Sequence, residues 1–293
     1  SYEPDIIHCH LRNESVLCLF VMNIPIIRTL QNSMPLQSSV FNNGLSSANK
    51  ILIILEKIFF IKKNVHLIAC NYCSQKQLNA FLKKYNKKCL TKINNAVDLK
   101  RLINFDYSNN KKSKLVIITI GTLCKPKNQT MSILAFNILM KRYKNAELWI
   151  IGEGEDSKKL NKLVKKLKIN HKIKFLGRVS SVEKYLKQAT LYWSTSISEG
   201  FSIANLEAIS MGIPILATKV DGNIEMFKNF PNCMVEYDDF NSLASKSIDL
   251  IEDKKKINAI SKDLKKYAVK KYNINNISNK YHDIYSSVTE QYN

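Results

Sequence analysis

Short apolar runs alternate with amphipathic stretches along the second half of the chain. Runs rich in Ile, Leu, Val and Trp, each closed by glycine or polar residues, predict strands at 115–120, 147–151, 172–176, 189–193 and 214–217. Stretches of helical period predict helices at 126–143, 157–168 and 182–188, and a further helix that ends before Gly212. This alternation is typical of βαβ units, so we expect a parallel sheet covered by helices.

The rest of the chain shows the same pattern less completely. Strands are predicted at 5–10, 25–30 and 66–69, and a helical tail runs from Lys254 to about Gln291 with a break near 273–276. The polar segments predict a loop at 43–49, a solvated basic segment at 83–88, an interdomain linker at 109–113 and a turn at 221–222. With 293 residues the chain is long enough for two α/β domains.

Glycines and acidic residues stand where the predicted strands end. Gly121, Gly152 and Gly177 each close a strand. Glu199 and Glu207 follow the next strand, in a glycine-containing turn that leads into a helix. Parallel strands bind ligands at their carboxyl ends, and a helix N-terminus there can hold an anion. Two carboxylates beside it suggest a ligand that also carries hydroxyls, such as a sugar nucleotide. Taken alone, however, the two residues are better explained as solvated acids at a helix start, where the helix dipole favours negative charge.

The charge of the chain is unusual for a globular protein. The formal net charge is +21, and only five of the 45 basic residues are arginines. Proteins that read nucleic-acid sequence rely on bidentate arginine contacts, so we expect no nucleic-acid partner. A lysine-rich chain fits the codon bias of an AT-rich genome, and it equally fits peripheral attraction to an anionic membrane surface. Both explanations remain open.

The cysteines and the apolar runs bear on location. The seven cysteines are odd in number and irregularly spaced, which is typical of a reducing cytosol rather than of a disulfide framework. Cys70 and Cys73 have metal-ligand spacing but lack a second pair, so we expect no metal there. No apolar run reaches the roughly 18 residues of a membrane span, and no signal-peptide pattern follows Ser1. We therefore expect a cytoplasmic protein, at the inner face of the plasma membrane if it contacts one.

A longer pattern surrounds the two acids and extends along the chain. Its central part is Ser196, Glu199, Gly200, Phe201, Glu207 and Ala208. Linked segments are Gly121 with Lys127 and Asn128, then 152–154, 175–177, 211–214 and Gly222 with Glu225, and in the first half 4–10 and 94–98. This pattern resembles the signature of the retaining GT-B glycosyltransferases of the group 1, or family 4, type. The resemblance covers essentially the whole chain.

The resemblance implies an α/β fold of the GT-B type. Two Rossmann-like, doubly wound parallel-sheet domains would face each other across a cleft, with the first one incomplete because the chain begins near the family's fourth strand. The domains would be 1–112 on the acceptor side and 113–270 on the nucleotide-sugar side. Residues 271–293 would form a helix that crosses back to the first domain.

The resemblance also assigns roles to individual residues. Glu207 would bind the ribose hydroxyls, Glu199 the transferred sugar, and Lys127 the diphosphate leaving group; Glu199 and Lys127 are the catalytic candidates. The remaining donor-site candidates are Gly121, Thr122, Gly152, Gly154, Val179, Gly200, Phe201, Ser202 and Ile203. On the acceptor side the candidates are His10, Gln31 and Asn95. His8 and His10 alternate along the first strand, so we expect only one of them to face the cleft.

The implied reaction moves a hexose from a UDP- or GDP-sugar to a lipid-linked or glycan acceptor with retention of configuration, in cell-envelope polysaccharide synthesis. The family needs no metal or other cofactor, because protein cations and helix dipoles stabilise the leaving group. Two residues depart from its pattern: Thr122 stands where an arginine is usual, and Gln31 where a histidine is common. These departures keep open the alternative of a catalytically degenerate sugar-nucleotide-binding protein or partner-dependent subunit. A third hypothesis, a basic nucleic-acid binder, rests on the net charge alone and predicts steeply salt-dependent binding.

Overall fold

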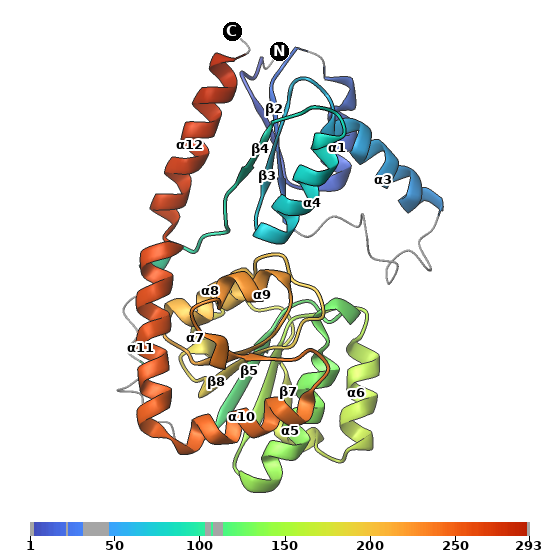
Figure 1. Cartoon of the computed structure of the whole chain (residues 1–293). Coiled ribbons are helices and arrows are strands. Elements are labelled where there is room, and N and C mark those ends of the chain that lie inside the picture. The colour runs from blue at the N-terminus through green and yellow to red at the C-terminus, as the bar shows by residue number, and fades with distance from the viewer. Residues whose placement is uncertain (1–2, 22, 32–46, 103–106, 108–113, 292–293) are drawn as a thin grey trace. The chain divides into compact units, whose positions relative to one another are not determined.

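The computed structural model describes residues 3–21, 23–31, 47–102, 107 and 114–291, and these divide into two compact units. The first unit contains Ser1–Asn95 and Asn275–Asn293, and the second contains Ala96–Ile274. Figure 1 shows the elements of each unit. Both units are built from parallel strands and helices, which confirms the α/β class predicted from the alternating pattern.

The first unit holds, among its described residues, a four-stranded parallel sheet of order β1-β2-β3-β4. The strands are β1 (Ile7–Cys9), β2 (Ile26–Leu30), β3 (Val65–Ala69) and β4 (Leu90–Lys92). The helices are α1 (Arg12–Leu17), the 3-10 turn η1 (Cys18–Phe20), α3 (Ser47–Phe60), α4 (Tyr72–Lys83) and α12 (Ile274–Glu290). A core of buried residues from β2, β3, α3 and α4 includes Ile26, Phe59, Leu67 and Leu78.

The second unit holds, in the described part of the chain, a six-stranded parallel sheet of order β10-β9-β8-β5-β6-β7. Its strands are β5 (Val116–Ile120), β6 (Glu147–Ile151), β7 (Ile173–Phe175), β8 (Leu191–Ser194), β9 (Ile215–Thr218) and β10 (Met234–Val235). Its α-helices are α5 (Gln129–Arg142), α6 (Ser157–Lys166), α7 (Glu183–Leu186), α8 (Ile203–Ser210), α9 (Asp221–Met226), α10 (Phe240–Glu252) and α11 (Lys254–Lys271). The 3-10 turns are η2 (Leu99–Arg101), η3 (Lys125–Lys127), η4 (Asn170–Lys172) and η5 (Pro231–Cys233).

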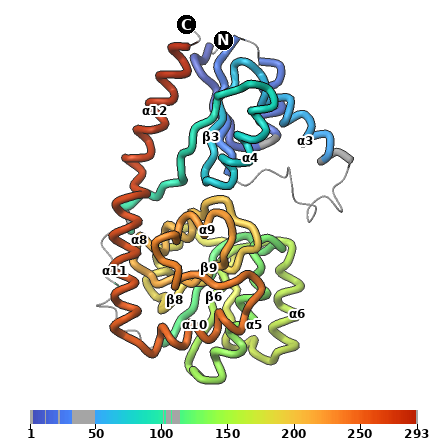
Figure 2. The backbone as a smooth tube through the Cα atoms, viewed as in Figure 1, coloured from blue at the N-terminus to red at the C-terminus, as the bar shows by residue number. Residues whose placement is uncertain are grey.

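Helices cover both faces of this second sheet, as the tube in Figure 2 shows. Side chains of α5, α6 and α10 share one core with the strands, which includes Phe136, Leu160 and Trp193. On the other face α8 packs against α11. Trp193 and Trp149 are both buried, at 0% and 8% exposure, because each lies on a strand covered by helices.

Several local predictions were wrong, for identifiable reasons. The pair Asp221 and Gly222, predicted as a turn, begins helix α9. Of the predicted loop at 43–49, residues 47–49 begin α3, and the rest lies outside the described residues, as does the predicted linker at 109–113. The helix predicted from Pro126 is divided, because Asn128 adopts a left-handed conformation at φ 46° between η3 and α5. Helices α3 and α4 were not predicted: α3 is apolar on several sides, which hides its period.

Candidate functional site

The strand order of the second unit reverses at β5. This strand has β6 on one side and β8 on the other, so the chain winds outward from it in both directions. Ligands of doubly wound sheets bind outside the carboxyl ends of the strands at such a reversal. The loop after β5 carries Gly121 and Lys127, and the loop after β8 carries Glu199. The topology therefore brings the predicted donor residues to the position where this sheet can bind a ligand.

The glycines allow these loops to pack closely. A Cβ on Gly152 would lie 2.1 Å from the carbonyl oxygen of Gly121, and Gly152 has a positive φ of 136°. A Cβ on Gly154 would lie 2.3 Å from the carbonyl oxygen of Leu123. Backbone hydrogen bonds also join the loops, from the Gly121 amide to Ile151 at 2.9 Å and from the Gly152 amide to Gly177 at 2.8 Å. The predicted glycines thus allow close backbone contacts between the loops that follow β5, β6 and β7.

Lys127 and Glu199 form an ion pair at the centre of this edge. The Nζ of Lys127 donates to Oε2 of Glu199 at 2.5 Å, and Ser196 Oγ donates to the same oxygen at 3.0 Å. The Glu199 side chain is 8% exposed and that of Lys127 is 27% exposed. The pair is therefore held in place yet open on the lysine side, where an anion can reach the ammonium group.

The loop that carries Lys127 is anchored to β8 by polar contacts. Thr195 Oγ1 donates to the carbonyl oxygens of Lys127 and Asn128, at 3.2 and 3.0 Å. Ser132 on α5 bonds to the same hydroxyl at 3.0 Å. Both Thr195 and Ser132 are buried. Sequence reasoning did not single out Thr195, although a polar residue directly after a buried strand was a signal that could have found it.

Glu207 lies on α8, one turn past the helix start, and it is half-buried. Both Glu199 and Glu207 act on Tyr192, which is fully buried on β8: burial raises the pKa of its hydroxyl, and the two negative charges raise that pKa further. Both carboxylates therefore lie within electrostatic range of the same phenol. The sequence analysis did not identify Tyr192 as a site residue, because a tyrosine in an apolar run is usually core.

The turn from Glu199 to the start of α8 carries the other predicted donor residues. Ser202 is the N-cap of α8, and its hydroxyl accepts a hydrogen bond from the Asn205 amide at 3.3 Å. Gly200 and Phe201 are buried, whereas Ile203 is 52% exposed. The Gly222 amide donates to the Glu199 carbonyl at 3.0 Å, and a Cβ on Gly222 would lie 1.7 Å from the Gly200 carbonyl oxygen. Helix α9 can pack on this turn only because residue 222 is glycine.

An aromatic cluster packs against the turn from Glu199 to the start of α8. The rings of Phe201 and Tyr272 lie 5.2 Å apart, and Tyr272 lies 5.6 Å from Tyr267 with a hydrogen bond of 3.2 Å between their hydroxyl oxygens. Tyr272 is 1% exposed and follows the end of α11. The residue that ends α11 therefore packs its ring against Phe201, a contact that the sequence pattern did not show.

The remaining donor-side candidates lie at the rim of this edge. Thr122 is exposed directly after Gly121, with its carbonyl bonded to Gln129 at 2.9 Å. Val179 is half-buried beyond β7 and Gly177. The adjacent Arg178 amide bonds to Glu153 at 3.3 Å, which ties the β7 loop to the β6 loop.

The acceptor-side candidates follow strands of the first unit. Gln31 follows β2 and Asn95 follows β4, at the same edge of the sheet. Cys70, directly after β3, bonds to both segments: its thiol donates to the Gln31 carbonyl at 3.0 Å, and its carbonyl accepts from Asn94, the neighbour of Asn95, at 2.9 Å. His10 is exposed after β1, and its carbonyl accepts a hydrogen bond from Arg28.

The prediction that His8 and His10 would face different ways was wrong. Their rings lie 4.2 Å apart, because residues two positions apart on a strand point to the same face. His8 is held between Tyr285 Oη at 2.7 Å and Thr29 Oγ1 at 2.8 Å. Burial, followed by the charges of His10 and Arg28, lowers the pKa of His8 to about 4. His8 is thus a neutral histidine that attaches α12 to the sheet.

No group of three or more His, Cys, Asp or Glu side chains among the described residues is placed to hold a metal ion. No described helix is long and apolar enough to cross a membrane.

Comparison with known protein families settles the affiliation of the chain. Residues 100–270 match the family model described as glycosyl transferases group 1. The chain belongs to this family. Its two parallel sheets have the GT-B fold, and HepE of Anabaena, solved with UDP-glucose, superposes with a TM-score of 0.81 at 20% identity over 97% of this chain and 79% of that protein.

This group 1 glycosyl transferase is also similar in sequence to two curated relatives. An uncharacterized glycosyltransferase of Methanocaldococcus jannaschii is 27% identical over 231 residues, which cover 74% of the chain and 56% of the relative. The N-acetylgalactosamine-N,N'-diacetylbacillosaminyl-diphospho-undecaprenol 4-alpha-N-acetylgalactosaminyltransferase of Campylobacter jejuni is 28% identical over 219 residues, covering 73% of the chain and 57% of the relative. The chain thus spans little more than half the length of either relative.

Proposed function

We propose that this protein transfers a hexose from a nucleotide diphosphate sugar to a lipid-linked or glycan acceptor, with retention of configuration, in cell-envelope polysaccharide synthesis. The observation that carries the proposal is the Lys127–Glu199 pair at the strand-order reversal of the second sheet. UDP is the favoured nucleotide, because HepE, which shares the fold, was solved with UDP-glucose. The Campylobacter relative is named for a diphospho-undecaprenol acceptor, which supports a lipid-linked acceptor for this protein.

Each half of the pair has a separate role in this proposal. The ammonium group of Lys127 has three donors, so it can keep Glu199 and also bind the diphosphate. It would stabilise the charge that develops on the leaving phosphate. Glu199 would accept hydrogen bonds from hydroxyls of the transferred sugar, and Glu207 from those of the ribose. The amides at the start of α8 would support the phosphates with the helix dipole.

Retention of configuration needs the acceptor to attack on the face that the leaving group vacates. In the proposed scheme the departing donor phosphate takes the acceptor proton, while the chain positions both reactants and stabilises charge. Gln31, His10 and Asn95 would contact the acceptor. Gln31 can donate a hydrogen bond but cannot carry the proton, which is consistent with a scheme in which the phosphate does.

We propose a cytoplasmic location. The seven cysteines, all of them within the described ranges, form no disulfide bonds, which fits a reducing compartment. A lipid-linked acceptor would place the enzyme at the inner face of the plasma membrane.

A thermal-shift screen of UDP- and GDP-sugars, followed by a transfer assay with the sugar that stabilises most, tests the function. We expect stabilisation by a UDP-sugar, turnover of that donor, and loss of turnover in Glu207→Ala. If the protein binds UDP in a calorimeter but releases no sugar, even with lipid-linked acceptors, then the alternative of a non-catalytic sugar-nucleotide-binding subunit holds. Full activity of Glu207→Ala would contradict the donor site.

A further inference from the structure

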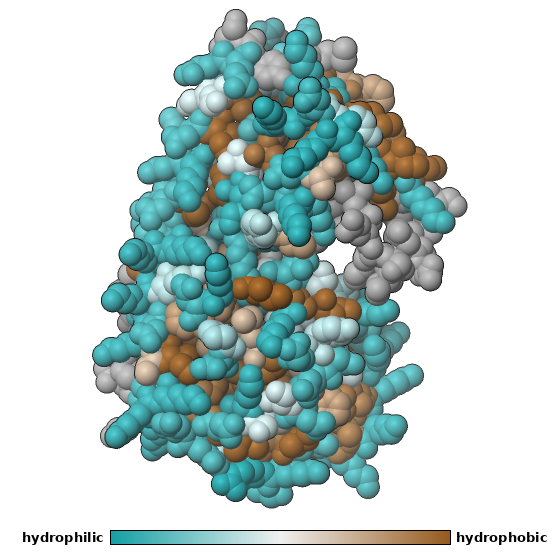
Figure 3. All heavy atoms as spheres, in the orientation of Figure 1, coloured by the Kyte–Doolittle hydropathy of each residue, from teal (hydrophilic) through white to brown (hydrophobic). Residues whose placement is uncertain are grey.

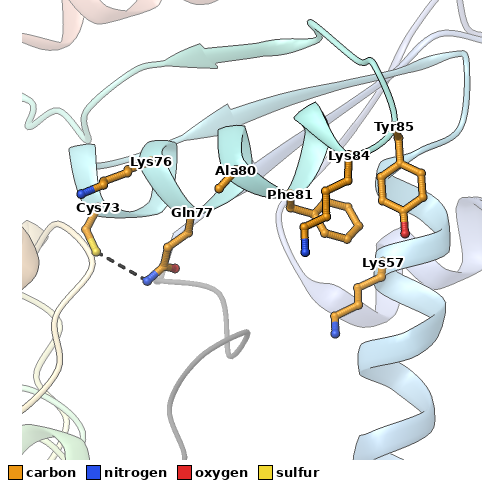
Figure 4. A pocket seen from close by; sticks show the side chains of 8 residues that line it. All are labelled: Lys57, Cys73, Lys76, Gln77, Ala80, Phe81, Lys84 and Tyr85. Carbon is orange, nitrogen blue, oxygen red and sulfur yellow. Dashed lines mark hydrogen bonds between the residues drawn. The ribbon is translucent and has the colours of Figure 1, made fainter.

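A pocket of about 620 Å³ lies between α3 and α4 in the first unit, apart from the donor residues. Lys57 comes from the last turn of α3, and all the other residues lie along one side of α4 and its end. Figure 4 shows their side chains. The lining residues are Lys57, Cys73, Lys76, Gln77, Ala80, Phe81, Lys84 and Tyr85, and we call this the α3–α4 basic pocket.

The α3–α4 basic pocket is positively charged and contains no acidic residue. Three of its eight lining residues are lysines. Helix α4 has no Asp or Glu from Tyr72 to Lys83. The acid closest to Lys57 along α3 is Glu56, which points into the protein, where it is 5% exposed and paired with Arg28 at 3.4 Å. The three ammonium groups therefore attract an anion from solvent, and a phosphate group offers acceptors to several of them at once.

An exposed apolar strip lies beside this pocket on α3. Ile51, Ile54 and Ile58 are 57%, 56% and 48% exposed, and their spacing of three and four residues puts them on one side of the helix. Lys50 and Lys57 are seven residues, or two helical turns, apart, so they lie on one side of α3. Each is adjacent in sequence to an isoleucine of the strip, so the two lysines border it. Figure 3 shows hydrophobic surface gathered over this helix. Three neighbouring exposed isoleucines on one helix mark an interaction surface rather than scattered apolar residues.

We propose that this surface docks on an anionic phospholipid bilayer. The α3–α4 basic pocket holds the phosphate of a lipid headgroup, while Ile51, Ile54 and Ile58 contact the acyl-chain boundary. Basic residues near an anionic leaflet and apolar side chains at its interface add their contributions to binding. Single-stranded nucleic acid is a poorer match: the ring of Tyr85, 49% exposed in the pocket, could stack on a base, but such a ligand would leave the three exposed isoleucines in water. The proposal goes beyond the transferase function, since membrane binding requires neither donor nor turnover.

Vesicle flotation of the purified full chain tests the proposal. Vesicles of phosphatidylcholine with phosphatidylglycerol are compared with pure phosphatidylcholine at about 0.15 M salt. We expect partition into the anionic vesicles only. The variant Lys57→Gln/Lys76→Gln/Lys84→Gln should lower this partition by about tenfold to 100-fold, as expected when three basic residues leave an anionic surface.

Two matched controls separate the surface from the general charge of the protein. Lys158→Gln/Lys162→Gln/Lys165→Gln on the exposed side of α6 removes the same charge and should lower partition by no more than about twofold. Ile54→Ser/Ile58→Ser should weaken vesicle binding, whereas Ile224→Ser/Ile274→Ser, which changes isoleucines of 49% and 44% exposure elsewhere, should not. Unchanged thermal unfolding of each variant shows that it is folded.

Four outcomes would overturn the proposal. Equal losses in the two lysine variants would mean that only the overall charge matters. Equal binding to neutral and anionic vesicles would show that the charged headgroup plays no part in binding. Equal losses in the two isoleucine variants would show that the apolar strip plays none. Binding of inorganic diphosphate or of a single-stranded oligonucleotide through the same lysines, without vesicle binding, would assign the pocket to a soluble ligand.

Discussion

The ammonium nitrogen of Lys127 lies 2.5 Å from a carboxylate oxygen of Glu199, although the two residues are 72 positions apart in the chain. They meet because β5 and β8, which are neighbours in the sheet, end side by side. The pair joins a cation suited to a diphosphate with a carboxylate suited to sugar hydroxyls. This combination is the chemical basis of the proposed transfer reaction.

Replacement of either member of the pair should reduce sugar transfer strongly. We expect Lys127→Ala to lower kcat/KM by about 100-fold or more, because the leaving group loses the cation that stabilises its charge. Glu199→Gln should lower it by a similar factor while keeping the hydrogen bond from Ser196. Because the two side chains act as a unit, the double variant should lose less than the product of the single losses. Initial rates with the preferred donor measure each effect.

The control for this series is Lys125→Ala. Lys125 lies in the same 3-10 turn as Lys127 but is exposed. It should retain nearly all activity. If Lys125→Ala and Lys127→Ala are equally impaired, the role of Lys127 is only to contribute positive charge to the loop.

Gly222→Ala should destabilise the second unit. An added Cβ would lie 1.7 Å from the Gly200 carbonyl oxygen, so either α9 or the turn from Glu199 to the start of α8 must move. We expect a loss of roughly 1–3 kcal/mol in the free energy of unfolding and weaker UDP binding, since overpacking forces backbone shifts. Urea unfolding and calorimetry measure the two effects. The control Lys228→Ala, at an exposed position after α9, should change neither the free energy of unfolding nor the UDP affinity. Normal UDP affinity in Gly222→Ala would show that the turn tolerates the backbone movement.

Tyr272 should affect donor binding through Phe201. In Tyr272→Ala the ring that lies 5.2 Å from Phe201 is lost, and we expect the donor KM to rise about tenfold as the turn loosens. Tyr272→Phe keeps the ring and loses only the hydrogen bond to Tyr267, so its KM should stay near that of the parent protein. Steady-state kinetics with both variants at a temperature where each is folded make the comparison. A parental KM in Tyr272→Ala would remove this positioning role.

The stability of the chain should depend on pH through His8. Its pKa is lowered to about 4, mainly by burial and then by the charges of His10 and Arg28, whereas an unfolded histidine titrates near 6.5. Between these values the unfolded chain binds the extra proton, so the free energy of unfolding rises with pH and is lost as pH falls from about 6.5 toward 4. Allowing for solvent screening, we expect a loss of about 1–2 kcal/mol.

Urea unfolding at several pH values measures this effect. His8→Gln should flatten the pH dependence, since glutamine does not titrate. His282→Gln, at an exposed position on α12, should leave it unchanged. An unaltered slope in His8→Gln would mean that another group governs the acid sensitivity.

Local signals in the sequence were sufficient for much of the second unit. Strands β5 to β9 overlap predicted apolar runs, which glycine closes after β5, β6 and β7, and burial on both faces of a parallel sheet requires such runs. Helix α9 and the left-handed Asn128 were missed because their contacts are with residues distant in the chain: Gly222 packs against Gly200, and Thr195 bonds to the Asn128 carbonyl. A pattern read over a few residues does not contain that information. In the first unit, the apolar residues of α3 hid its period, because its exposed isoleucines stand where polar residues would normally mark the solvent side.

By itself, the sequence determined the α/β class, the family and the identity of the two acids, because strand ends, glycines and the spacing of Glu199 and Glu207 are local properties of the chain. Only the tertiary structure decided that Lys127 pairs with Glu199, that Thr195 and Tyr272 hold their loops, and that three lysines line one pocket between α3 and α4. The physical reason is that strand order and helix packing bring together residues that are distant along the chain, and no local pattern specifies those contacts.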